Sequence, residues 1–502
     1  MSRSTLLLGL LLALSVLVRA WVKPVYVGAP DPALTDSALG IDWPFGDDLK
    51  GASDALHTLL PRNLLREGLA ATGGWPNLNP TDVAPADYFW YDHHPPGITL
   101  FTAAALHLFG THERVTRGVA LLFATLALLA VAAAARRAGG AWVAALAIVV
   151  MSAPPGGLYW ASQLDYPVPT MAACGLFLVL ATRDEVGVAG SFVMGVAVTA
   201  ALCFDFLAAL ALVALFLDRL LCGPRGRRRL FGWPLVGITL VALILLWKHL
   251  ALSRHGHGDD LGVLGNVLQI WQLPADVTTE LYLATVRDHL RSLLTPLGEV
   301  VLLLGLLRAL LPGGDPALKR FVRVTALLAL GAGLLPRARA WDHPYFQLYW
   351  LLPLGGSAAL LGTLLLPVAG SAATGLRRAG RGAGALLAAF LATAFIWLGA
   401  DSLPRGTPDA TRPSSHLLGR ELAAKAGRDV PVVLIPAATG LNPIQVSWYA
   451  DRLVLPVAGD PPDLADPHTT RMLALYGVAQ TAVEFAPGDP WPGRDGLKSL
   501  RR

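Results

Sequence analysis

Residues 117–135 read RGVALLFATLALLAVAAAA, and this stretch decides the class of fold. From 118 to 135 it carries no charged side chain. As a helix rising about 1.5 Å per residue, it would cross most of the ~30 Å hydrocarbon layer of a membrane. We therefore expect a transmembrane helix here.

The rest of the chain has the same character. Of its 502 residues, 54% are hydrophobic and 15% are charged, whereas a soluble domain has about 25% charged residues. The chain is too poor in charge to cover a water-facing surface, so an α-helical polytopic membrane protein is predicted. The net charge of +5 comes from short basic clusters between apolar stretches. Such clusters orient membrane helices and do not indicate a nucleic-acid partner.

Apolar stretches predict about eleven transmembrane helices. The first is expected to be an uncleaved span, because a secretory signal, the alternative, would need a clearer small-residue cleavage site. The apolar segment 97–110 is short and suits an interfacial or re-entrant helix better than a crossing. The predicted spans are 4–21, 117–135, 139–156, 164–182, 187–204, 206–221, 230–250, 293–312, 322–336, 345–367 and 382–400.

The distribution of arginine and lysine predicts the orientation. With a cytoplasmic N-terminus, the basic clusters fall in cytoplasmic loops, and the outer turns near 157–163 and Asp205 have none. Counting 97–110 as a crossing would place Arg136 and Arg137 outside. An integral protein of the cell (inner) membrane is predicted, with basic residues inside at Arg136, Arg137, Arg183, Arg219, Arg225, Arg227, Arg228, Arg229, Arg308, Lys319, Arg320, Arg323, Arg377, Arg378 and Arg381.

This topology divides the chain into a transmembrane domain, 1–400, and a tail, 401–502. The tail alternates a helical pattern at 415–427 with apolar strands at 431–436, 453–457 and 480–485. Such alternation predicts a small extracytoplasmic α/β domain. The first extracytoplasmic loop, 22–116, is too long to be a mere connection and too rich in aromatic residues to be disordered.

Within that loop, residues 54–68 predict an amphipathic helix, since Leu56, Leu59, Leu60 and Leu64 share one face and Gly68 follows as a C-cap. The other motifs are the acidic pair Asp47-Asp48, the pair Arg62-Asn63, the turn His93-His94-Pro95-Pro96, the pair Phe109-Gly110, an arginine at 114 or 117, Asp165 in QLDYPVP, and WDHPYFQLYWLLPL at 341–354.

In their order and spacing over residues 1–400, these motifs resemble the GT-C-type membrane glycosyltransferases that use polyprenyl-phosphate sugars, a group that contains protein O-mannosyltransferases and aminoarabinose transferases. The resemblance implies an inverting enzyme that moves a sugar from a polyprenyl phosphate to a hydroxyl of a lipid, glycan or protein at the extracytoplasmic membrane face.

The resemblance also implies a catalytic base, a loop carboxylate that takes the proton of the acceptor hydroxyl. Asp48 matches the family pattern best. Asp47 and Asp54 are rivals, because the loop is a few residues longer here than in the family. Asp165 is the other catalytic candidate, since a charge at the mouth of a span is costly unless it is paired or hydrated.

Substrate-binding candidates are His93, His94, Arg337, Arg339, His343 and Tyr345. The two arginines lie in an outer loop, where insertion bias disfavours them, and would suit a donor phosphate. Anchoring to lipid head groups is the alternative for these arginines, as helix capping is for the histidines. The three cysteines offer no metal-binding spacing. His93 and His94 could also bind a metal or act on a proton, so no cofactor is assigned and the assistance of a divalent cation stays open.

Two functions of other classes compete with this hypothesis. A transporter or flippase of a lipid-linked glycan would show paired repeats and charges at mid-span. The chain instead has no visible repeat, and its acidic residues cluster at span ends. A non-catalytic membrane scaffold that presents the tail is the third reading.

Overall fold

The computed structural model describes most of the chain up to residue 365 and parts of the tail. The described residues are 3–22, 28–29, 39, 45, 49–78, 90–91, 94–183, 186–222, 232–255, 272–273, 277–365, 391, 393–395, 397–398, 409–425, 432–436, 443–451, 453–457 and 482–484. The predicted span 382–400 and the acidic pair Asp47-Asp48 therefore lie largely or wholly outside them.

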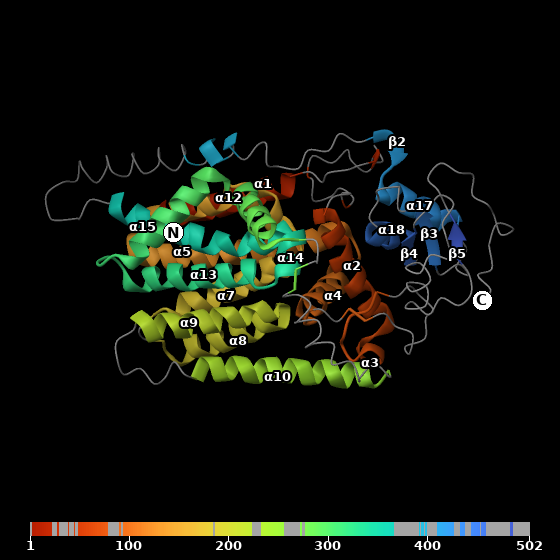
Figure 1. The fold of residues 1–502 in the computed structure, drawn as a ribbon, viewed down its shortest axis with the longest axis horizontal. Helices are drawn as coiled ribbons and strands as arrows, with labels where there is room; N and C mark the ends of the chain where they lie inside the picture. Colours follow the sequence, from red (N-terminus) through yellow and green to blue (C-terminus); the bar gives the residue numbers. More distant parts are fainter. Residues whose placement is uncertain are drawn as a thin grey trace.

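Helices dominate the described residues, and the long ones run side by side along the longest axis of the molecule (Figure 1). The helices of the bundle are α1 Arg3–Trp21, α5 Glu113–Ser152, α7 Pro167–Ala181, α8 Val188–Phe204, α9 Ala209–Cys222, α10 Gly232–Ser253, α12 Thr279–Leu310, α13 Pro316–Leu334 and α15 Leu351–Leu365. Most coincide with predicted spans to within a few residues.

The helix α5 reverses direction at Gly140, whose φ of 76° is a left-handed value that glycine adopts readily. A Cβ atom placed on Gly355 of α15 would lie 2.8 Å from Val131 and 3.4 Å from Met151. In a continuous helix those two positions would be about 30 Å apart. The chain therefore folds back at Gly140, between the predicted spans 117–135 and 139–156.

Two further breaks shape the end of the bundle where the site lies. Residues Pro155–Ser162, which form α6 Pro155–Leu158 and the 3-10 turn η4 Trp160–Ser162, meet α7 at 110°. The helix α12 is interrupted at Thr295, with φ 64°, next to Pro296. It thus begins well before the predicted span 293–312, because a helical segment in the predicted outer loop 251–292 joins it.

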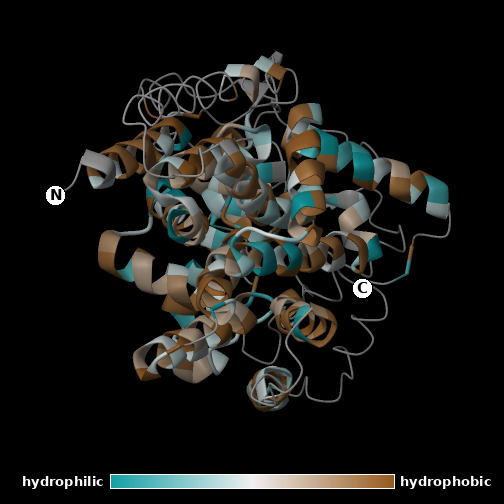
Figure 2. Cartoon of the chain, turned by 90° about the vertical axis from the view of Figure 1, so that its left-hand side faces the viewer, coloured by the Kyte–Doolittle hydropathy of each residue, from teal (hydrophilic) through white to brown (hydrophobic). Residues whose placement is uncertain are grey.

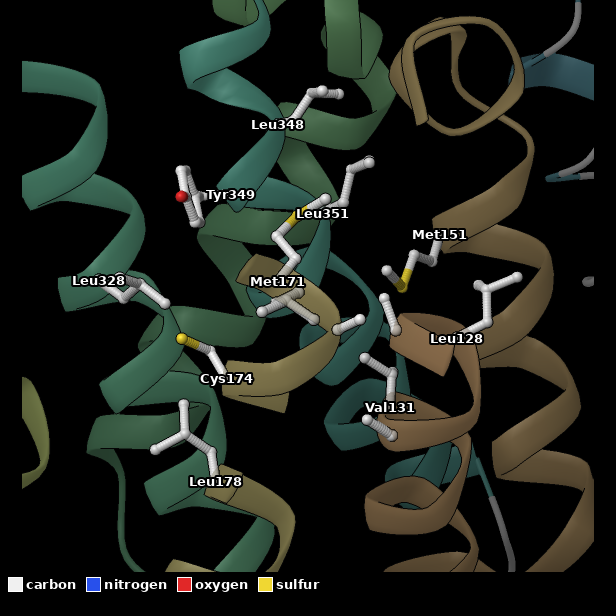
Figure 3. Packing of buried hydrophobic residues seen from close by; sticks show 14 of the residues in the cluster. Leu128, Val131, Met151, Met171, Cys174, Leu178, Leu328, Leu348, Tyr349 and Leu351 are labelled. Carbon is white, nitrogen blue, oxygen red and sulfur yellow. The ribbon is translucent and has the colours of Figure 1, made fainter. Parts of the chain in front are cut away.

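The core of the bundle is apolar and small-residue-rich, which lets helices approach closely. Figure 3 shows Met171, Cys174 and Leu178 of α7 between side chains of α5 on one side and Leu328 of α13 on the other. Leu351 of α15 and Tyr349 of the preceding 3-10 helix η7 Pro344–Trp350 close this layer. The packing fixes α7, and with it the break that precedes Pro167.

Large apolar side chains also face outward. Phe192 of α8 is 72% exposed and Leu221 of α9 is 78% exposed, and hydrophobic residues cover most of the helices when the bundle is viewed end-on (Figure 2). By length and composition, three helices among the described residues could cross a membrane, namely α5, α10 and α12; the bent pair 155–181 could be a fourth. An outward apolar surface of this kind is what a lipid environment requires.

The first loop and the tail gather at one end of the bundle (Figure 1). The loop forms α2 Leu49–Glu67, α3 Leu69–Thr72, α4 Gly97–Phe109 and the short strand β1 Gly28–Ala29. The tail forms β2 Asp409–Pro413, α17 Ser415–Lys425, α18 Pro443–Ala450 and a parallel sheet in the order β4-β3-β5, from Leu453–Val457, Val432–Pro436 and Ala482–Glu484. β1 pairs with β2, so loop and tail are joined.

Candidate functional site

The helix α2 carries the polar side chains of the candidate site. It extends one turn further toward the N-terminus than the predicted helix 54–68 and ends before Gly68, whose φ is 85°. Leu60 and Leu64 are buried, as their shared face predicts. Ser53, Asp54 and His57 lie on a face directed toward the break between η4 and α7.

Asp54 is fully buried and both of its oxygens are engaged. Its Oδ1 accepts a hydrogen bond of 2.8 Å from the backbone N–H of Leu164. Its Oδ2 lies 3.2 Å from Nζ of Lys50, one helical turn earlier, and 3.7 Å from Nε of Arg117 at the start of α5. A buried carboxylate needs such partners, and here two cations and an amide provide them.

Asp165 is the second buried carboxylate, and it lies in the break between η4 and α7. Its Oδ2 accepts hydrogen bonds from Ser53 at 2.7 Å and from the side-chain amide of Gln163 at 3.1 Å. Its Oδ1 accepts from the N–H of Tyr166 at 2.6 Å and lies 3.8 Å from Nε2 of His57. The structure therefore brings Asp54 and Asp165 together around one turn of α2.

An aromatic layer continues the site from Asp165 toward α8. The ring of His94 stacks on Tyr166, with centroids 3.5 Å apart, and Nδ1 of His94 lies 3.7 Å from Oδ1 of Asp205. Asp205 also accepts a hydrogen bond of 3.2 Å from the hydroxyl of Tyr349. His94 is partly exposed, so this layer is the part of the cluster that a ligand could reach directly.

Asp205 has a local structural role as well. Its side chain accepts from the N–H of Leu207 at 3.0 Å and so caps the turn η5 Phe206–Ala208 between α8 and α9. A polar residue is common at a tight turn. The contacts of Asp205 with His94 and Tyr349 could not be predicted, because they join elements that are distant in the sequence.

The remaining predicted residues fall into two groups. Asp47, Asp48 and His93 lie outside the described residues, and the side chain of Arg339 does too. Arg337 is exposed on the short helix α14 Arg337–Asp342, and the rings of His343 and Tyr345 stack at 5.0 Å. This second group lies on α14, η7 and the residue between them, and η7 also contains Tyr349, which reaches Asp205.

Several residues of the cluster were not singled out from the sequence. Lys50 could have been paired with Asp54 by its i, i+4 spacing on a helix. His57, which is buried and whose Nδ1 has no hydrogen-bond partner among the described residues, gave no signal beyond its position one turn after Asp54. Ser53 and Gln163 depend on the meeting of α2 with the break before α7, which no local pattern encodes.

Comparison with known proteins identifies the architecture. A family model described as dolichyl-phosphate-mannose-protein mannosyltransferase matches residues 93–251. The fold is similar to that of ArnT from Cupriavidus metallidurans, solved with undecaprenyl phosphate, at a TM-score of 0.60 and 16% identity over 96% of this chain and 92% of that chain. The chain has the GT-C glycosyltransferase fold.

A second GT-C structure agrees. The Archaeoglobus fulgidus oligosaccharyltransferase, in the apo form, gives a TM-score of 0.56 at 14% identity and covers 90% of this chain and 64% of that chain. No curated protein matches the chain by sequence. The fold that the sequence motifs suggested is confirmed, and the family match over 93–251 agrees with the glycosyltransferase resemblance. The family match begins at His93 and takes in His94, Asp165 and Asp205, whereas α2 precedes it.

The described part of this GT-C chain contains no group of three or more His, Cys, Asp or Glu side chains suited to a metal ion. Asp47, Asp48, Asp92 and His93 are among the residues with suitable side chains that lie outside it. Whether a divalent cation assists therefore stays an open alternative, as in the sequence analysis.

Proposed function

We propose that the protein is an inverting glycosyltransferase that moves a sugar from a polyprenyl-phosphate donor to a hydroxyl at the extracytoplasmic membrane face. The observation that carries this is the pair of buried carboxylates, Asp54 and Asp165, beside the cations Lys50 and Arg117, at one end of an apolar bundle. Similar folds have been solved with undecaprenyl phosphate and with a dolichol-phosphate, so a lipid phosphate is the donor class that they support.

The topology is part of this proposal. About eleven spans, with the N-terminus in the cytoplasm, place the first loop and the tail outside, because basic residues then remain inside. The joint position of α2 and α18 at one end of the bundle supports this arrangement (Figure 1). The parallel sheet with α17 and α18 supports reading the tail as a small α/β domain.

Within the site, Asp48 is proposed as the base. Asp54 and Asp165 already accept hydrogen bonds from backbone and side-chain donors and are buried, so an acceptor hydroxyl would have to displace those donors to reach them. Asp48 directly precedes the first residue of α2 and belongs to the loop. Asp54 and Asp165 would then have a structural role: they would hold α2 against the break before α7, next to the base and the substrate.

The leaving phosphate needs positive charge as the bond to the sugar breaks. Arg337 and Arg339 are proposed for this role, and His94 with Tyr166 for contact with substrate. The described position of Arg337, exposed on α14 next to η7, leaves its guanidinium accessible from outside the bundle. A forked guanidinium suits a phosphate better than an ammonium group does.

The proposal is tested by transfer with purified protein in lipid nanodiscs. Polyprenyl phosphates that carry different sugars are offered with an acceptor extract, and products are analysed by mass spectrometry. The extract is best taken from cells that lack the protein, since these should accumulate both the unused donor and the unmodified acceptor. Movement of a lipid-linked glycan across liposomes without any transfer would instead support the flippase alternative.

A further inference from the structure

The helix α18 of the tail packs directly on the outer face of α2. Phe45, Ala55, Leu59 and Trp448 form one buried apolar cluster, and Phe45 is completely inaccessible to solvent. The face of α2 that meets α18 lies opposite the face that carries Ser53 and Asp54. One helix thus has the tail on one side and the candidate site on the other.

Arg62 adds a polar anchor to this contact. Its Nη1 donates to the backbone oxygen of Trp448 at 3.0 Å, its Nη2 lies 3.1 Å from Oδ1 of Asp451, and its guanidinium lies 4.6 Å from the ring centroid of Trp448. Burial lowers the pKa of Arg62 to about 10, and Asp451 opposes this effect. A partly buried cation depends on such partners, so losing one of them weakens the whole contact.

Phe45 connects this contact to the site carboxylate. Its backbone N–H donates to the hydroxyl of Tyr449 at 2.7 Å. The guanidinium of Arg117 lies 5.1 Å from the centroid of its ring, and the Nε of the same arginine lies 3.7 Å from Asp54. A continuous series of contacts therefore runs from α18 through Phe45 and Arg117 to Asp54.

We propose that the tail is a working part of the transfer site, in which Tyr449 and Asp451 act as positioning residues for Phe45 and α2. The inference rests on the proposed function. Phe45 packs against α2 and contacts Arg117, which lies beside Asp54, so an anchored Phe45 holds the helix and this cation in place at the candidate site. A loss of this anchor shifts α2 and Arg117 at the site and slows transfer, without removing any group that touches the substrate.

The test uses the full chain in nanodiscs with two variants, Tyr449→Phe and Asp451→Asn. The first removes only the hydroxyl that accepts from Phe45. The second removes the charge that faces Arg62, and asparagine tolerates the left-handed backbone at this position, where φ is 50°. Asp288→Asn is the matched control, because it removes a carboxylate that pairs with Arg287 on the exposed surface of α12, away from this contact.

Two measurements test the positioning role: hydrogen exchange at Phe45 and the kinetics of sugar transfer. Hydrogen–deuterium exchange followed by mass spectrometry reports the amide of Phe45, which should exchange about fivefold faster in Tyr449→Phe, as expected for one lost hydrogen bond. In both test variants the kcat for sugar transfer should fall about tenfold or more, with the KM for the lipid donor within about twofold of wild type. The control should match wild type in both.

The outcomes differ for the two proposals. Wild-type kcat in both variants, with an active parent protein, would overturn the positioning role alone, whatever the exchange data show. Unchanged exchange at Phe45 in Tyr449→Phe would also overturn it, because the anchor would then not be the hydroxyl. A parent protein that transfers no sugar from any donor would overturn the proposed function, and the positioning role with it.

Discussion

The carboxylate of Asp54 accepts a hydrogen bond of 2.8 Å from the backbone of Leu164, although the two are 110 positions apart in the sequence. This bond joins the first loop to the break before α7, and Ser53 makes a second connection to Asp165 in the same place. The two carboxylates that the sequence analysis selected thus stabilise one junction between loop and bundle.

Asp48→Asn should abolish sugar transfer without reducing expression or membrane insertion. Asparagine keeps the size of the side chain but cannot take a proton, a loss worth at least about 10²-fold in rate. Initial rates of Asp47→Asn, Asp48→Asn and wild type in nanodiscs provide the comparison. If Asp48→Asn keeps full activity while Asp47→Asn loses it, the base is the neighbouring carboxylate.

Asp54→Asn should lower stability as well as activity. The substitution leaves Lys50 and Arg117 without their shared carboxylate in a buried site, and breaking such a pair costs about 3–5 kcal/mol. The thermal unfolding midpoint in detergent should therefore drop clearly. Asp288→Asn on α12 is the matched control, because Asp288 pairs with Arg287 at the surface and both side chains are largely exposed. Equal midpoints for the two variants would argue against a structural role for Asp54.

Replacement of Arg337 or Arg339 by alanine should reduce both donor affinity and kcat. Charge grows on the phosphate as it leaves, so its contact with a guanidinium is stronger in the transition state than in the ground state. The lysine variants should recover only part of the loss, since an ammonium group cannot bind two oxygens in parallel. Kinetics with a purified lipid-phosphate sugar measure this, with Arg287→Ala as an exposed control. Wild-type kinetics in both alanine variants would favour the alternative, in which these arginines bind lipid head groups.

The first loop and the tail should both react with a membrane-impermeant thiol reagent in intact cells or spheroplasts. Leu69→Cys and Arg420→Cys introduce exposed positions on α3 and α17. The native Cys222 is exposed at the end of α9 that the topology assigns to the cytoplasm. It should be labelled only after permeabilisation, so it serves as an internal control. Labelling of only one introduced cysteine would contradict the predicted topology.

The sequence predicted the helices well because their signal is local. The length of an uncharged stretch such as 118–135 directly predicts the length of the helix. The helix α2 ends just before Gly68, as its sequence pattern predicts. Among the described residues, α5, α10 and α12 are long and apolar enough to cross a membrane, whereas α8 is a shorter apolar helix.

The site was harder to predict, because its contacts join segments that no periodicity connects. Asp54 and Asp165 were selected individually, but the sequence does not reveal that Ser53 and Leu164 bring them to the same junction. The sequence places Asp205 at a tight turn, and its hydrogen bond with Tyr349 depends on the packing of η7 against the bundle. Such contacts follow from tertiary structure alone.

The reversal at Gly140 has a consequence for biogenesis. The two arms of α5 are joined without an intervening loop, so a ribosome would deliver them to the insertion machinery in immediate succession. Each arm satisfies its own backbone hydrogen bonds, and the pair can therefore enter the lipid as a finished hairpin. Arg136 and Arg137 stand next to its tip, where their charge opposes translocation. Synthesis of this hairpin would set the orientation for the helices made after it.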